Sequence, residues 1–100
     1  MKYTILQSPA AEADIIEAAL WYSLRREGLD IEFFYCIDAV VNSIERNPLQ
    51  FPKVFKNIHR ALLNRFPYGV YYTVNKANVI IHTVMHLSRS PRKWKKRYKH

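Results

Sequence analysis

Apolar residues recur at helical spacing through the first half of the chain. Ser8 and Pro9 are typical of a helix start, with a hydroxyl at the cap and a proline in the first turn. Four apolar residues then follow with a 3.6-residue period: Ile15, Ala18, Ala19 and Tyr22. The pattern predicts a helix over 9–26 that is stopped by Gly28.

A second apolar stripe follows directly. Its members are Phe33, Ile37, Val40, Val41 and Ile44. They predict a helix over 29–46 that ends at Asn47-Pro48, because the residue before a proline avoids the helical region. The connection between the two predicted helices is short, so we expect them to form an antiparallel hairpin.

After residue 50 the apolar period changes from 3.6 to 2. This alternation predicts strands over 58–65, 69–75 and 79–86, and their short connections favour an antiparallel meander. Residues 2–7 fit a further short strand, which we expect at the edge of the sheet. The predicted fold is α+β, in the order β-α-α-β-β-β, with an antiparallel sheet and an α-helical hairpin packed on one face.

The composition is typical of one globular domain over 1–100, with a basic tail over 88–100. No apolar run reaches the roughly 20 residues of a membrane span, and acidic residues come too early for a signal peptide. The single cysteine, Cys36, cannot form an internal disulfide and is expected to be a small buried residue. We therefore expect a cytoplasmic location and no membrane partner.

Charge is divided between the two halves of the chain. All eight acidic residues lie in the first 45 positions, whereas thirteen of the sixteen lysines and arginines follow them. Such polarity presents a positive field to nucleic acid or to an anionic protein segment. The alternative is a basic tail that is merely solvated.

The sequence offers little support for metal or acid–base chemistry. His82 and His86 share a strand face but stand about 13 Å apart, too far for one zinc ion. Asp14 and Glu17 are typical of acids on a solvated helix face near its start. Neither a Ser-His-Asp arrangement nor a Gly-rich phosphate loop is visible.

Arginines on the predicted sheet are the remaining candidates for functional residues. Arg60 and Arg65 have opposite parity on the first long strand, so we expect one of them on the open sheet face and the other near an edge. Beside tyrosines of the next strand, an arginine on the open face suits phosphate contact and base stacking, although ordinary cross-strand packing explains the tyrosines equally well.

Several motifs together form a family pattern. They are "SPAAEADIIEAALWYS" at the start, "NP..FP" after the second helix, "IHRALLNRFPYGVYY" in the middle and "H..R.P..W..R" at the end. Over nearly its whole length the chain resembles the toxins of the RelE/ParE superfamily of bacterial type II toxin–antitoxin, or plasmid-stabilisation, systems. The resemblance implies an acidic antitoxin that wraps and blocks the toxin. It further implies contact with operator DNA only through the antitoxin complex, and no cofactor.

The superfamily divides by target. The "RFPY" and "H..R.P..W" motifs look closer to the ParE branch, which poisons DNA gyrase and is not itself a nuclease. The resemblance then implies a target-binding set made of Arg60, Arg65, His86, Arg89 and Trp94.

The RelE branch cleaves mRNA on the ribosome and stays open as an alternative. Its candidate catalytic residues here would be Arg60, His86, Arg89 and Tyr98. Trp94 matches a position that is often tyrosine in that branch, and Lys53 and Lys56 match its lysines only loosely. An inactive relative that binds only antitoxin or operator DNA is a third reading.

Overall fold

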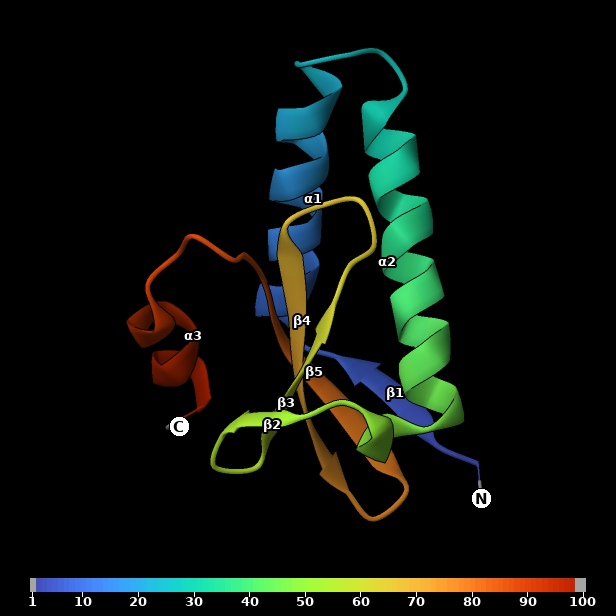
Figure 1. The fold of residues 1–100 in the computed structure, drawn as a ribbon, viewed down its shortest axis with the longest axis vertical. Helices are drawn as coiled ribbons and strands as arrows, with labels where there is room; N and C mark the ends of the chain where they lie inside the picture. Colours follow the sequence, from blue (N-terminus) through green and yellow to red (C-terminus); the bar gives the residue numbers. More distant parts are fainter. Residues whose placement is uncertain (1, 99–100) are drawn as a thin grey trace.

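The computed structural model describes residues 2–98, with Tyr98 described through its backbone alone. The elements, labelled in Figure 1, follow in this order: β1 (Thr4–Gln7), α1 (Pro9–Ser23), α2 (Leu29–Arg46), a 3₁₀ turn (Pro48–Gln50), β2 (Lys53–Phe55), β3 (Ile58–Leu62), β4 (Tyr68–Asn75), β5 (Asn78–His86) and α3 (Pro91–Tyr98).

The strands form one sheet in the order β1-β5-β4-β3-β2. The expected α+β fold, with its helical hairpin and its β1 strand at the edge of the sheet, is confirmed. β2, which pairs antiparallel with β3, comes in addition to the expected strands, and the basic tail, for which a short helix is one of two expectations, forms α3. β1 runs parallel to β5, so the sheet is mostly rather than wholly antiparallel.

Some element boundaries differ from the predicted ones. α1 ends at Ser23 rather than at 26, and Gly28, with φ of 83°, precedes α2 in the left-handed region that glycine tolerates best. The strand expected over 58–65 stops at Leu62. The chain then turns through Arg65, whose φ of 75° is incompatible with a continuing strand.

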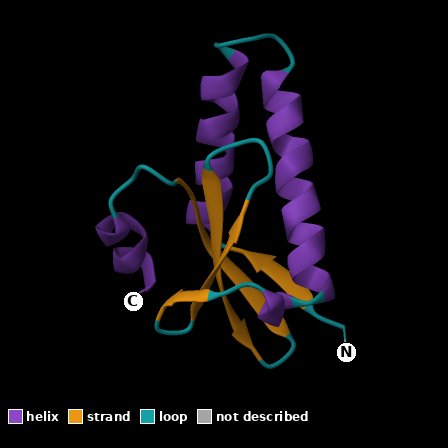
Figure 2. Ribbon diagram, in the orientation of Figure 1, coloured by secondary structure: helices purple, strands orange, loops and turns teal. Residues whose placement is uncertain are grey.

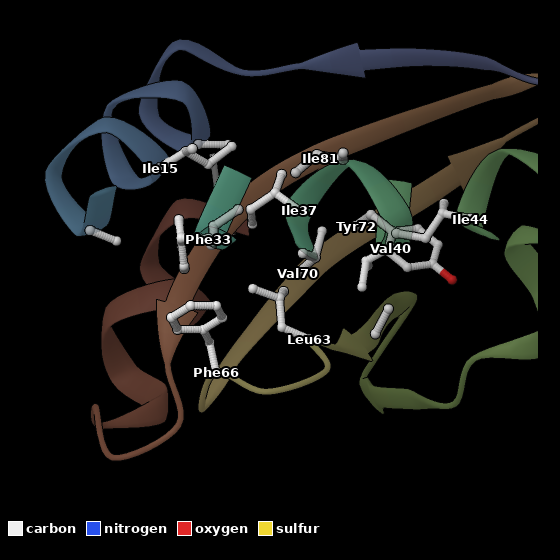
Figure 3. Packing of buried hydrophobic residues seen from close by; sticks show 14 of the residues in the cluster. Ile15, Phe33, Ile37, Val40, Ile44, Leu63, Phe66, Val70, Tyr72 and Ile81 are labelled. Atoms are coloured by element: carbon white, nitrogen blue, oxygen red, sulfur yellow. The ribbon is translucent and has the colours of Figure 1, made fainter. Parts of the chain in front are cut away.

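The helical hairpin covers one face of the sheet and forms the main core with it (Figure 2). Figure 3 shows Phe33 of α2 and Phe66 of the β3–β4 loop in this core, where their ring centres lie 5.3 Å apart. Cys36 is half-buried and packs against the core, so it is less buried than expected. No helix among residues 2–98 is long and apolar enough to cross a bilayer.

A bulge in β5 allows residues before it and after it to face the same core. Tyr71 pairs with Thr83 but Tyr72 pairs with Ile81, which leaves His82 as the extra residue. The insertion reverses the alternation, so Ile81 and Val84 both belong to the core under the hairpin.

Tyr72 ties the sheet to the exit of α2. Its side chain is 0% exposed, and its hydroxyl donates a 2.5 Å hydrogen bond to the carbonyl of Pro48. Burial raises the pKa of this phenol well above its usual value, so the hydroxyl keeps its proton and remains a donor.

Tyr72→Phe should lower the free energy of unfolding by about 1–3 kcal/mol, because it leaves the Pro48 carbonyl without its buried donor. Chemical denaturation followed by circular dichroism measures the change. Tyr35→Phe is the control, since Tyr35 is 71% exposed and its loss of a hydroxyl should stay within about 0.5 kcal/mol. Equal effects for the two variants would contradict a structural role for the Tyr72 hydroxyl.

Candidate functional site

A groove of about 690 Å³ is lined by α1, by the β4 and β5 ends that meet there, and by the segment that leads into α3. We call it the α1–α3 groove. Its lining combines three kinds of side chain: the acids Asp14 and Glu17, the apolar residues Leu20, Trp21 and Leu24, and the basic residues His86, Arg89, Lys93 and Arg97.

The apolar wall belongs to α1, which carries apolar side chains on both of its faces. One face, which includes Ile15 and Tyr22, is buried in the core. The opposite face leaves at least half of four large side chains exposed: Ile16, Leu20, Trp21 and Leu24. The Arg25 guanidinium lies 4.1 Å from the Trp21 ring centre, which places a cation beside this apolar stripe.

His86 ends β5 inside the groove. Its Nδ1 accepts a 3.0 Å hydrogen bond from the backbone N–H of Ser88. Its ring packs edge to face with Tyr68, with 5.2 Å between the ring centres. The bond to Ser88 uses Nδ1 as an acceptor, which is the arrangement of the tautomer with its proton on Nε2. As bonded here, neither ring nitrogen has a free lone pair, so His86 is not arranged as a general base.

The tyrosines beside His86 are no better placed to accept a proton from a substrate. Burial raises the pKa of Tyr68, and the nearby Tyr22 and Glu17 raise it further while Arg89 lowers it. Burial raises the pKa of Tyr22 as well. Both phenols are therefore neutral near pH 7 and can serve as packing surfaces and hydrogen-bond donors.

Asp14 is not the solvated helix acid that the sequence suggested. Its carboxylate accepts two hydrogen bonds from Arg97, of 2.5 and 3.1 Å, and a third of 3.0 Å from the backbone N–H of Val84. The bond to Asp14 raises the pKa of Arg97, which stays charged. The pattern could not reveal this pair, because its members lie 83 residues apart.

Trp94 fixes α3 to the sheet face opposite the helical hairpin. Trp94 is only 6% exposed. Its ring stacks on Tyr71 with 4.6 Å between the ring centres, and it packs edge to face with Phe55 with 6.0 Å between the ring centres. A residue expected to contact a target is thus used for packing. Tyr98, the other aromatic candidate on α3, has its side chain outside the described part of the chain.

Arg60 lies on the sheet face that carries α3. A Cβ at Gly69 would come within 3.1 Å of the Arg60 Cγ and Cδ and within 3.3 Å of the Tyr71 ring. The missing side chain of Gly69 therefore makes room for the arginine stem. The guanidinium is not part of the α1–α3 groove lining.

Arg65 lies elsewhere, against α2. It is exposed and forms a 2.5 Å ion pair with Glu32, which also pairs with Arg26 at 2.8 Å. Of the predicted site residues, the structure thus brings only His86 and Arg89 together in the groove. Among residues 2–98 we find no group of three His, Cys, Asp or Glu side chains able to hold a metal ion.

Arg97→Ala should loosen α3, because it removes the bidentate pair and leaves the half-buried Asp14 carboxylate with the Val84 N–H alone. We expect faster amide exchange over α3 and a loss of about 1–3 kcal/mol in unfolding free energy. Lys96→Ala is the control on the same helix, since Lys96 is exposed and forms no ion pair within the described chain. Identical exchange rates in the two variants would argue against the pair as an anchor.

No family model matches this sequence, and no curated protein matches it. Among solved structures, a chain titled "Chromosomal ParDE TA system from P. aeruginosa" is similar, with a TM-score of 0.74 at 16% sequence identity. The similarity covers 85% of this chain and 96% of that chain. Over most of its length, this chain therefore has the fold of a chain from that ParDE system.

Proposed function

We propose that this protein is the toxin of a type II toxin–antitoxin pair, that it inhibits DNA gyrase in the manner of ParE-like toxins, and that an acidic antitoxin neutralises it. The observation that carries the proposal is the α1–α3 groove, which sets an exposed apolar stripe beside Arg89 and Lys93, cations without an ion pair among residues 2–98, on a ParDE-like fold. A toxin of this kind needs such a surface for a protein partner.

The groove suits an amphipathic acidic segment. Leu20, Trp21 and Leu24 would take its apolar side chains, as large exposed residues do at interface centres. Arg89 and Lys93 lie on the opposite wall, where they would meet carboxylates. Asp14 does not oppose this charge, because Arg97 neutralises it, and Glu17 is the acid of the lining that forms no ion pair within residues 2–98.

Gyrase inhibition is favoured over mRNA cleavage by the state of the candidate catalytic residues. His86 has no free lone pair, and Trp94, which by the resemblance matches the position of the nuclease tyrosine, is buried and its indole N–H is too weakly acidic for proton transfer. Arg60 lies outside the groove that holds His86 and Arg89. A toxin that acts by binding does not require these groups to meet.

The antitoxin prediction can be tested with the protein encoded in the neighbouring reading frame. Isothermal titration should show tight binding that weakens as salt rises. Trp21→Ala should weaken it by about 2 kcal/mol, as expected for a central aromatic anchor. Tyr35→Ala, an exposed aromatic on α2, should change affinity little. Unchanged affinity for Trp21→Ala would show that the partner does not bind in this groove. The absence of binding at low salt would contradict the pairing with the neighbouring protein.

The target prediction requires induction of the toxin without its partner. We expect a DNA-damage response and loss of gyrase supercoiling activity in a purified assay, with ribosome-bound mRNA intact. Arg60→Ala should reduce the toxicity while the melting temperature moves by only a few degrees, because Arg60 is not fully buried and forms no ion pair within residues 2–98. Primer extension that shows cuts in ribosome-bound mRNA, with supercoiling untouched, would instead assign the RelE-like activity.

A further inference from the structure

Two lysines crowd one aromatic ring on the side of the molecule that carries α3. The Lys95 ammonium lies 4.4 Å and the Lys56 ammonium 5.3 Å from the centre of the Phe55 ring. The two charges are therefore within about 10 Å of each other, close to the Debye length in physiological salt, and they repel. An anion bound between them would relieve that repulsion.

These lysines belong to a larger basic area that joins the β2–β3 turn to α3, which lie side by side in Figure 1. We call it the β2–α3 surface, made of Lys53, Lys56, Arg92, Lys93, Lys95 and Lys96, of which Lys93 also lines the α1–α3 groove. None of the six forms an ion pair with a carboxylate within residues 2–98. All acidic residues of the chain precede residue 46, so this surface has no compensating charge in its own segment.

The cations of α3 are spread widely around its outer side. At about 100° per residue, Arg92, Lys93, Lys95 and Lys96 cover an arc of about 160° that is centred opposite the buried Trp94. The positively charged side chains therefore lie on both sides of the exposed surface of the helix. This distribution matches a ligand with two rows of negative charge better than a single acidic segment.

Nucleic acid fits this surface better than a protein does. A protein partner needs apolar anchors, and the one apolar residue between Pro91 and Arg97, Trp94, is buried. The α1–α3 groove has such anchors, whereas on the β2–α3 surface the Phe55 ring is partly buried against Trp94 and has two lysines over it. An α-helix about 10–12 Å wide also matches the roughly 12 Å major groove of duplex DNA, which phosphates border on both sides.

We propose that the β2–α3 surface binds the phosphate backbone of double-stranded DNA, directly and without base specificity. This contact differs from the sequence-based expectation that DNA is reached only through an antitoxin complex. It does not depend on the proposed gyrase inhibition, because lysine–phosphate attraction alone supplies it. The two claims can therefore fail separately.

Fluorescence anisotropy with a labelled duplex of arbitrary sequence tests the proposal on the full chain. We expect binding at about 50 mM salt that falls steeply towards about 200 mM. Lys56→Gln with Lys96→Gln should weaken binding about tenfold and reduce the slope of log K against log salt by about 2.

Lys76→Gln is a matched control for Lys56→Gln. Both lysines are exposed, both occupy hairpin turns, and both have positive φ, of 57° and 49°. Lys76 lies in the β4–β5 turn and outside the β2–α3 surface, so its loss should leave DNA affinity within about twofold.

Three results would overturn the proposal. One is the absence of duplex binding at about 50 mM salt, and the second is an equal loss for Lys56→Gln and Lys76→Gln, which would mean a diffuse effect of net charge. The third is tighter binding of poly-glutamate or of single-stranded RNA than of the duplex. Circular dichroism of each variant confirms that it is folded before its affinity is compared.

Discussion

Much of this structure depends on how the Asp14 carboxylate is satisfied. β1 covers the edge of β5 only from Asn78 to Ile81, so the backbone beyond it would present unpaired donors. Asp14 accepts the N–H of Val84 in that uncovered stretch and at the same time binds Arg97 of α3. One side chain thus joins α1, the edge of the sheet and α3, and the walls of the α1–α3 groove follow from that connection.

The position of α3 also separates two surfaces of different chemistry. Trp94 and Arg97 point inward, to Tyr71 and to Asp14, and so hold the helix against the sheet. The remaining cations of the helix form no ion pair within residues 2–98, although Lys95 lies over the Phe55 ring. On one side of α3 lies the apolar stripe of α1, and on the other side the β2–β3 turn adds further lysines around the Phe55 ring.

Periodicity predicted the hairpin because each helix buries one regular face, and it predicted the long strands from their apolar alternation, although β4 is buried on both faces and a bulge reverses the alternation of β5. It did not predict β2, whose three residues are too few for an alternation to be recognised and whose pairing with β3 is irregular. Side chains whose partners are distant in sequence were also missed. Asp14 looked like a solvated acid and Trp94 like a contact residue, since neither Arg97 nor Tyr71 is a neighbour that local patterns can identify.

The basic residues around β3 show why charge in a sequence does not by itself locate a binding site. His59 is buried, stacks on Tyr72 and bonds the Phe51 carbonyl at 2.7 Å. Arg60 uses the space over Gly69, and Arg65 pairs with Glu32. His59 and Arg65 thus have partners within the fold, whereas the lysines of the β2–β3 turn and the outer cations of α3 form no ion pair within residues 2–98. An anionic partner should therefore be sought at α3 and the β2–β3 turn before β3 itself.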